Sequence, residues 1–514
     1  SKPSAWPEAV RAADSQTTSA TPLQINSGGR GDGASGLGLS ASPGATSMAG
    51  AADASNPETG ISETEGIGSR LANSPTPQRQ PEQVGSWGAP EWTGAANSRS
   101  STSPTVTTAN VAAVAAPVFS ILTSADTFLL HSRPTASKRI FLDFDGYTMA
   151  NSAWEQGGAL QVSAYKPFSG DLNYEVQQIW KSLAEFFAPF DLDVTTQDPG
   201  SGRLSKTSSS DTEWGIRTVF AANQINLKTG NRITVSSPNS GGQAYTGSFN
   251  WNTDEPALIF ITTGSYDAAV AAAHEIGHSL GLHHEGTSTS EYYSGHGGSG
   301  VTSWCPIMGT PYLDGVRENL ITWTNGAYYN ANNREDDLSI ITTYNGFGYR
   351  PDDVGNTFTS AKALSGTSFQ QFGVIERNTD VDMYSFVTGP GNVSLRISNA
   401  VQAWVASGSN SGDPYLSQTY SDRLVTPSLS TLDICANLYD ANGNLIATSN
   451  PVDSLAASFD LNLSAGRYYL SVDGAGYGNP FSSTPTGYTD YGILGQYVVS
   501  GLVQDSNGLL ITGP

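Results

Sequence analysis

The sequence predicts an α+β protein. We expect a domain with a twisted mixed sheet, a backing helix and a histidine-bearing helix, then an all-β sandwich, with a disordered segment before both. Small and polar residues dominate roughly the first hundred positions, strand and helix patterns alternate as far as residue 346, and short strand patterns fill the remainder. The 514 residues suffice for two folded units, and we expect boundaries at 1–120, 121–349 and 350–514.

The N-terminal segment, residues 1–120, consists mainly of Ser, Gly, Ala, Thr and Pro, with few aromatic or β-branched side chains. Such a composition cannot bury enough apolar surface to offset the chain entropy lost on folding. We therefore expect a disordered leader or pro-segment. It contains no cysteine, so a thiolate from this segment cannot block a metal site.

The next segment, residues 121–349, shows the patterns of a sheet with a backing helix. The alternation in Lys138–Tyr147 predicts a strand that ends in a turn, and residues 173–190 carry apolar side chains at helical spacing up to Pro189. The apolar run Glu255–Gly264 suits a strand buried on both faces. Gly241–Trp251, just before that run, is the expected edge strand. Further strands are expected at 190–198 and 213–223.

A second helix is expected directly after the apolar run. Ser265 is a suitable N-cap, and Asp267 suits the positive end of the helix dipole. Strong helix formers continue until Gly281, which lacks a Cβ atom and can adopt the positive φ that ends a helix. Four of the chain's six histidines lie on or just after this helix.

The C-terminal segment, residues 350–514, contains short strand patterns separated by turn signals, which is typical of an antiparallel β-sandwich. We place its start near Tyr349–Asp352, where Pro351 interrupts the preceding pattern. Cys305 and Cys435 are too few for a disulfide framework, although one bridge between them is conceivable.

Composition excludes several classes of partner. The net charge of -22 disfavours nucleic acid and anionic membrane surfaces as partners. No apolar run is long enough to span a bilayer. The chain begins without the pattern of a signal peptide, so we expect any signal to have been removed or to lie upstream. We expect a secreted, extracellular monomer.

The spacing of the histidines predicts metal chemistry. His274 and His278 are four positions apart on the expected helix, so both imidazoles project from one face and can share a metal ion. Glu275, beside the first of them, can hold a metal-bound water, whose pKa zinc lowers to about 7. The carboxylate can accept the water's proton and pass it to a leaving amine. A turn at Gly281 would bring a third ligand back to the metal.

The motif HEIGHSLGLHH, His274–His284, resembles the H-E-x-x-H-x-x-G-x-x-H signature of the metzincin metalloendopeptidases at every defined position. The resemblance implies a metzincin-like catalytic domain in which His274, His278 and His284 bind one catalytic Zn²⁺ and Glu275 is the general base. His283 occupies an undefined position of the signature and is expected to be a solvated or supporting residue.

Two features downstream of the motif extend this resemblance. Met308, in WCPIMGTPY, fits the methionine turn that lies beneath the metal in metzincins. The segment 332–346 resembles the closing helix of the catalytic domain, with Asn333 as its cap and a buried stripe of Leu338, Ile341 and Tyr344.

The segment after Met308 departs from the pattern of some metzincin branches. Those branches have a tyrosine two residues after the methionine, where this chain has Thr310. The candidates for a cleft residue or a transition-state donor are His296 and Tyr312, and also Tyr292 and Tyr293. Each of the four could equally be an ordinary loop residue.

The C-terminal segment resembles the bacterial pre-peptidase C-terminal domains that accompany secreted peptidases. The resemblance implies a possible structural Ca²⁺ site, formed by Asp380 and Asp382 with Asp352 or Asp353. Turns rich in Asp are also common as simply solvated turns. We expect this domain to assist secretion, substrate docking or stability.

The function expected from the sequence is that of a secreted zinc endopeptidase that cuts protein or peptide substrates and is made as a zymogen. The alternative is a catalytically inactive adhesion or binding protein on a metzincin scaffold, to which the RGD tract at Arg30–Asp32 would be relevant. The presence of Glu275 favours the enzyme, because an inactive copy has no physical need for the base.

Overall fold

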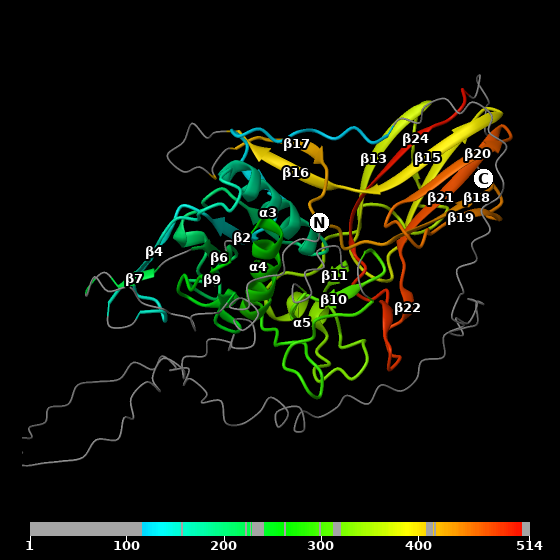
Figure 1. Cartoon of the computed structure of the whole chain (residues 1–514). Coiled ribbons are helices and arrows are strands. Elements are labelled where there is room, and N and C mark those ends of the chain that lie inside the picture. Colours follow the sequence, from blue (N-terminus) through cyan, green and yellow to red (C-terminus); the bar gives the residue numbers. More distant parts are fainter. Residues whose placement is uncertain are drawn as a thin grey trace, which may run out of the picture. The chain divides into compact units, whose positions relative to one another are not determined.

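The computed structural model describes residues 116–155, 158–221, 224–226, 228, 241–261, 264–297, 300–311, 320–407, 415 and 418–505 (Figure 1). The expected leader therefore lies outside the described residues, apart from its last five positions. No helix in the described part of the chain has both the length and the apolar character that a membrane crossing requires.

A mixed sheet of eight strands forms the framework of the histidine-bearing region. In spatial order its strands are β17 (Tyr420–Val425), β16 (Val401–Ala406), β1 (Leu130–His131), β5 (Asp193–Thr195), β2 (Lys138–Asp143), β6 (Trp214–Phe220), β9 (Ala257–Ile259) and β8 (Gly242–Gln243). The four inner strands from β5 to β9 are parallel, whereas β8 pairs antiparallel with β9. The expected edge strand is confirmed, because β8 ends the sheet, although only two residues of Gly241–Trp251 form it.

Two helices, α3 (Leu172–Phe186) and α4 (Ser265–Ser279), pack against each other and against this sheet. The Asp171 carboxylate caps α3 by accepting a hydrogen bond from Tyr174 N at 3.0 Å. The expected cap of α4 was wrong: Ser265 is its first helical residue, and Gly264 is the N-cap. Gly264 has φ 146°, a conformation that favours glycine, so the backbone geometry decides the cap.

The helix α5 (Asp337–Tyr344) corresponds to the expected closing helix but begins later than predicted. Its N-cap is Asp336, which accepts a hydrogen bond from Ser339 N at 2.9 Å, so Asn333 is not the cap. Leu338 and Ile341 are buried as expected, whereas Tyr344 is 69% exposed. Each step of three residues drifts by about 60° around an α-helix, so Tyr344 lies about 120° away from Leu338 and leaves the buried face.

Smaller elements surround the main sheet. They are the sheet of β3 (Tyr147–Met149), β4 (Leu160–Val162) and β7 (Gln224–Asn226), the parallel pair β10 (Trp304–Pro306) and β11 (Leu320–Thr322), and the 3₁₀ turns Ser201–Arg203 and Ser248–Asn250. The pair β10 and β11 carries the segment that leads into Met308.

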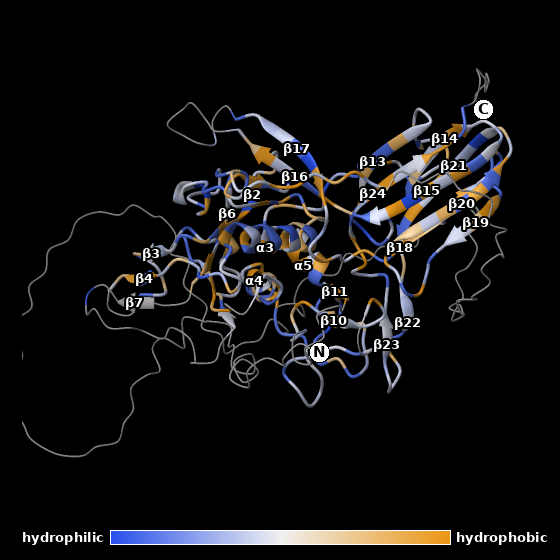
Figure 2. Cartoon of the chain, turned by 45° about the horizontal axis from the view of Figure 1, so that its top comes forward, coloured by the Kyte–Doolittle hydropathy of each residue, from blue (hydrophilic) through white to orange (hydrophobic). Residues whose placement is uncertain are grey.

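The C-terminal segment forms the expected β-sandwich. One sheet contains β12 (Lys362–Ala363), β14 (Asp382–Thr388), β21 (Gly466–Gly474), β18 (Ile434–Tyr439) and β19 (Leu445–Ser449); the other contains β13 (Ser368–Ile375), β24 (Gly495–Leu502), β15 (Gly391–Asn399) and β20 (Ala457–Leu463). Buried and exposed residues alternate along β18 and β20, as they do along a strand with one face in a core. Figure 2 shows hydrophobic and hydrophilic residues interspersed along the strands of the sandwich. A hairpin of β22 (Tyr477–Asn479) and β23 (Thr486–Tyr488) extends from the sandwich.

The main sheet and the sandwich do not come from two separate segments of the chain. Strands β16 and β17 lie beyond the expected boundary at 349/350, yet β16 pairs antiparallel with β1 and extends the histidine-bearing sheet. All described residues belong to one compact unit. The residues before β1 also contact the C-terminal strands, because Ser120 N donates a hydrogen bond to Leu424 O of β17 at 2.7 Å.

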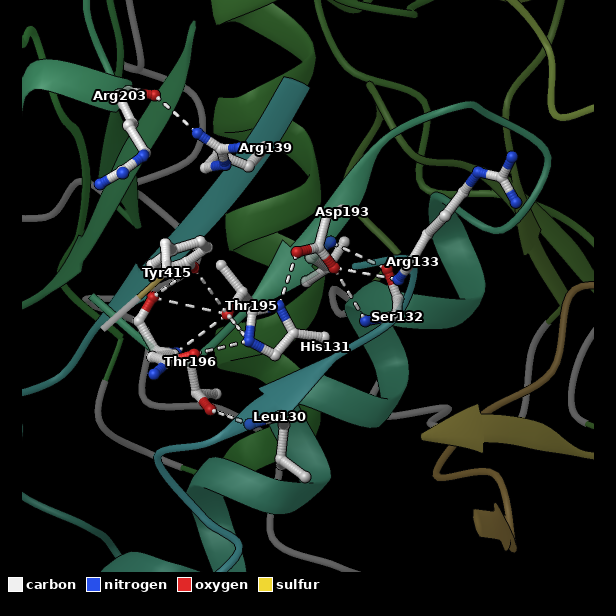
Figure 3. A network of polar contacts seen from close by, with 12 residues as sticks. Leu130, His131, Ser132, Arg133, Arg139, Asp193, Thr195, Thr196, Arg203 and Tyr415 are labelled. Atoms are coloured by element: carbon white, nitrogen blue, oxygen red, sulfur yellow. Dashed lines mark hydrogen bonds and ion pairs between the residues drawn. The ribbon is translucent and has the colours of Figure 1, made fainter. Parts of the chain in front are cut away.

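A buried network of polar contacts joins β1 to β5 in this part of the sheet (Figure 3). The Nδ1 atom of His131 on β1 lies 2.7 Å from Asp193 Oδ2 on β5, and Nε2 lies 2.9 Å from Gln197 Oε1. The ring of Tyr415, from the loop between β16 and β17, packs edge-on against His131. The network thus joins an N-terminal strand, a central strand and a C-terminal loop. No disulfide joins Cys305 and Cys435.

Candidate metal centre

The end of α4 brings the third histidine back toward the first two. His274 and His278 are buried on α4, with ring centroids 4.9 Å apart. The helix then closes at Gly281, whose φ is 101° and whose N–H donates to His278 O at 2.9 Å. The reversed chain places His284 Nε2 at 3.0 Å from His278 Nε2. The turn expected at Gly281 is confirmed.

Each of the three imidazoles is oriented by a hydrogen bond at its Nδ1 atom. The partners are Ile307 O at 3.1 Å for His274, Leu282 O at 2.8 Å for His278 and Glu291 Oε1 at 2.9 Å for His284. These acceptors require Nδ1 to carry the proton, so all three Nε2 atoms present lone pairs. One ligand atom from each residue lies within 4.8 Å of the others.

The protonation state of the three histidines suits a cation. Burial, followed by repulsion from a neighbouring histidine, lowers the pKa of His274 and His278 to about 3 and that of His284 to about 2. The rings are therefore neutral near pH 7. The His274 Nε2 atom is buried and makes no hydrogen bond within the described structure. Three converging neutral nitrogen donors fit a zinc ion that keeps an open position.

His283 points away from this cluster. Its ring is half-exposed, and its Nδ1 and backbone N–H contact the two carboxylate oxygens of Glu335 at 2.7 and 3.0 Å. Asn333, which does not cap α5, donates to His284 O at 3.2 Å and so fixes the backbone of the third histidine. The structure therefore places His284, and not its neighbour, with the other two histidines.

The Glu275 side chain extends from α4 toward the edge strand β8. It is buried beside His274 on α4, and a Cβ atom on Gly242 of β8 would lie 2.5 Å from its Cγ atom. Only a residue without a side chain permits this approach. The candidate general base therefore lies directly against the strand that ends the sheet.

Met308 supports the cluster from beneath. It is fully buried in a turn in which Gly309 N donates to Pro306 O at 3.1 Å. A Cβ atom on Gly277, between the two helical histidines, would lie 2.5 Å from the Met308 sulfur. The preceding residue, Ile307, supplies the carbonyl that orients His274. The methionine turn thus orients His274 directly and packs against α4, the helix that carries His274 and His278.

The candidate transition-state donors make different contacts in the structure. Both ring nitrogens of His296 are engaged, Nδ1 with Tyr293 OH at 2.7 Å and Nε2 with Gly487 O at 2.6 Å. His296 therefore joins the histidine loop to β23 through its two ring nitrogens. Tyr312 lies outside the described residues. The Tyr292 hydroxyl lies 3.3 Å from His284 Nε2.

A second cluster lies at the start of the sandwich. Asp352, Asp380 and Asp382 bring carboxylate oxygens within 4.8 Å of one another. Asp353 does not join them, because its carboxylate accepts the Val374 N–H at 3.1 Å and points toward β13.

Sequence analysis missed Asn356 as a member of this second cluster. One end of its side-chain amide lies 3.1–3.2 Å from Asp352 Oδ2, Asp380 Oδ1 and the Val354 carbonyl oxygen. An amide oxygen at that end would complete a set of oxygen ligands with the Val354 carbonyl. The spacing of Asp352, Val354 and Asn356 at alternate positions was the available signal.

The electrostatics of the second cluster are unfavourable without a counter-charge. Burial raises the pKa of Asp382 to about 10 and that of the adjacent Glu376 to about 8. One carboxylate oxygen of each of Glu376, Asp380 and Asp382 is buried with no hydrogen-bond partner in the described structure. A cation would supply what these oxygens lack.

A family model matches the segment of the chain that contains the first site. Residues 97–295 match the family model of the matrixins, a metzincin family, and this segment contains the three histidines and Glu275 but ends before Met308. The match confirms the metzincin resemblance and supports a zinc metallopeptidase. It also begins inside the expected leader.

Solved structures resemble parts of the chain. The pre-peptidase C-terminal domain of collagenase from Bacillus anthracis is 14% identical with a TM-score of 0.15, over 30% of this chain and 97% of that one. PliG, a periplasmic inhibitor of g-type lysozyme from Aeromonas hydrophila, is 11% identical with a TM-score of 0.16, over 28% and 96% of the two chains. No curated protein matches the chain.

The two neighbouring histidines can be separated by experiment. Replacing His284 by Ala should lower zinc affinity by at least about tenfold, since supporting residues alone commonly account for 10–100-fold. His283→Ala should leave zinc affinity within about threefold, because its ring contacts Glu335. Competition with a chromogenic chelator measures both. A larger loss in the His283 variant would contradict the ligand set.

The packing beneath the metal predicts that Gly277 tolerates no side chain. Gly277→Ala forces its Cβ atom against the Met308 sulfur and should destabilise the fold by about 1–3 kcal/mol. Gly202→Ala is the control, because a Cβ atom there would meet nothing within 4 Å. Urea denaturation compares the two variants, and equal stability would show that Met308 does not constrain the helix.

Proposed function

We propose that this protein is a secreted zinc endopeptidase that hydrolyses peptide bonds in proteins, with Glu275 as general base. The observation that carries the proposal is the convergence of three neutral imidazole nitrogens beside Glu275. His278 Nε2 and His284 Nε2 are only 3.0 Å apart, a distance that two lone pairs tolerate when a cation lies between them.

The chemistry follows from the positions of these residues. When bound, zinc supplies a Lewis acid that activates water near neutral pH and polarises the scissile carbonyl. Glu275 accepts the proton of the attacking water and returns it to the leaving amine. Its burial against Gly242 limits the access of the carboxylate to bulk water.

The edge strand supports a protein or peptide substrate. β8 is the last strand of the sheet and lies next to Glu275. An extended peptide can add to such an edge through main-chain hydrogen bonds, and side-chain pockets then set specificity. A peptide added at this edge would run past Glu275, and its main-chain hydrogen bonds would not require a particular side chain at the edge.

Export and zymogen processing are parts of the same proposal. The strongly acidic composition and the low-complexity segment 1–120 support an extracellular enzyme with a removable leader. Hydrogen bonds from Val118 to Gln370 and from Ser120 to Leu424 tie the last part of that segment to strands β13 and β17. We therefore place processing upstream of Val118.

Casein digestion tests the enzymatic proposal. The processed wild-type protein, without the leader, should cleave casein, and a zinc chelator should abolish the cleavage. Glu275→Ala should retain zinc but lose at least about 10²-fold in rate, the usual contribution of a general base. Zinc content by atomic absorption is the control for folding. A zinc-loaded wild-type protein that cleaves nothing would support the inactive binding scaffold instead.

We also propose that the second cluster binds a structural calcium ion. Hard oxygen donors from Asp352, Asp380, Asp382, the Val354 carbonyl and the Asn356 amide suit calcium, which takes six to eight oxygen ligands. Asp380 and Asp382 are 3% and 0% exposed, and each has a carboxylate oxygen with no hydrogen-bond partner in the described structure. The ion would join the start of the sandwich to β14.

Calcium should stabilise the protein through this cluster. At 100 times the dissociation constant, the ion should add about 2.7 kcal/mol to the free energy of unfolding. The Asp380→Asn variant should lose most of this gain, whereas Asp453→Asn, at an exposed position outside the cluster, should keep it. Thermal unfolding with calcium, and with magnesium as a control, measures the effect. An equal calcium response in the two variants would refute the site.

A further inference from the structure

The loop after the third histidine returns to that histidine within eight residues. Thr287 pairs with Ser290 in an isolated bridge, and Tyr293 N donates to Glu285 O at 2.7 Å. Gly286 permits the return, because a Cβ atom there would lie 2.3 Å from the carbonyl oxygens of Ser290 and Glu291. The closed loop therefore presents residues 291 and 292 to His284.

Glu291 and Tyr292 contact opposite ring nitrogens of His284. The Glu291 carboxylate lies 2.9 Å from Nδ1, the nitrogen that points away from the cluster. The Tyr292 hydroxyl lies 3.3 Å from Nε2, the nitrogen that faces His278. The Tyr292 ring lies over His284 with centroids 4.3 Å apart and is 7% exposed. A phenol hydroxyl is thus held on the metal-binding side of the site.

Neighbouring polar residues do not occupy this position. The Tyr293 hydroxyl contacts His296, and the Tyr293 ring stacks on Tyr328 with centroids 4.5 Å apart. The backbone N–H of Thr310, two residues after Met308, donates to Tyr293 O at 2.9 Å and so contacts the backbone of the loop. Among the described candidates, Tyr292 alone combines a hydroxyl donor with a contact to a metal-binding nitrogen.

We propose that Tyr292 is a catalytic hydrogen-bond donor, whose hydroxyl stabilises the oxyanion that develops on the scissile carbonyl. The assignment rests on the proposed peptidase function and adds a residue to its site. A preorganised donor at a developing negative charge contributes about 10²–10³-fold in rate. The hydroxyl is preorganised because packing against the His284 ring and burial restrict the Tyr292 ring.

The Tyr292→Phe variant isolates the hydroxyl, because it keeps the ring that packs on His284. On zinc-loaded protein from which the leader upstream of Val118 has been removed, kcat/KM for casein should fall by at least about 10²-fold. Zinc affinity, measured by chelator competition, should stay within about threefold. Tyr293→Phe is the matched control and should change kcat/KM by less than about threefold, since its hydroxyl contacts His296.

A binding measurement tests the donor without relying on turnover. Acetohydroxamate places a charged oxygen at a zinc ion, and its affinity by calorimetry should fall about tenfold in Tyr292→Phe, as expected for a hydrogen bond to a charged group. Unchanged hydroxamate affinity, or a loss of zinc itself, would overturn the assignment. An inactive wild type that still shows the Tyr292-dependent affinity would refute the peptidase while leaving the donor in place.

Discussion

The candidate metal centre depends on three hydrogen bonds made by the Nδ1 atoms of its histidines. Each bond fixes a neutral tautomer whose Nε2 lone pair faces inward. The acceptors come from three segments: the helix end at Leu282, the methionine turn at Ile307 and the returning loop at Glu291. Because burial keeps the three rings neutral, their Nε2 lone pairs are available to a cation.

The surroundings of this centre are built from distant parts of the chain. β16 and β17 extend the sheet that supports α4, and the buried Glu185 at the end of α3 accepts a hydrogen bond from the Thr431 hydroxyl at 3.1 Å. The His296–Gly487 contact joins the histidine loop to the β22–β23 hairpin. The segment 121–349 taken alone would lack two strands of its main sheet, so the C-terminal segment is part of the same folded structure.

Local sequence rules were sufficient where the geometry is local. The spacing of His274 and His278 on a helix, and the turn at Gly281, depend only on helical periodicity and on the φ angles that glycine allows. The edge strand and the β-sandwich follow from alternation and turn signals, which also act over a few residues. Ser265 and Asn333 show the limit even here, because both are plausible caps by residue type and neither caps its helix.

Tertiary structure decided whatever depends on residues far apart in sequence. Nothing in the periodicity of β16 reveals that it pairs with β1 about 270 positions earlier. The placement of Tyr292 on His284, and of His296 on Gly487, depends on how one loop closes against two partners. Sequence alone predicted which three histidines come together, because their geometry belongs to one helix and one turn. Only the folded chain decided what orients them, since those contacts exist only after distant segments pack together.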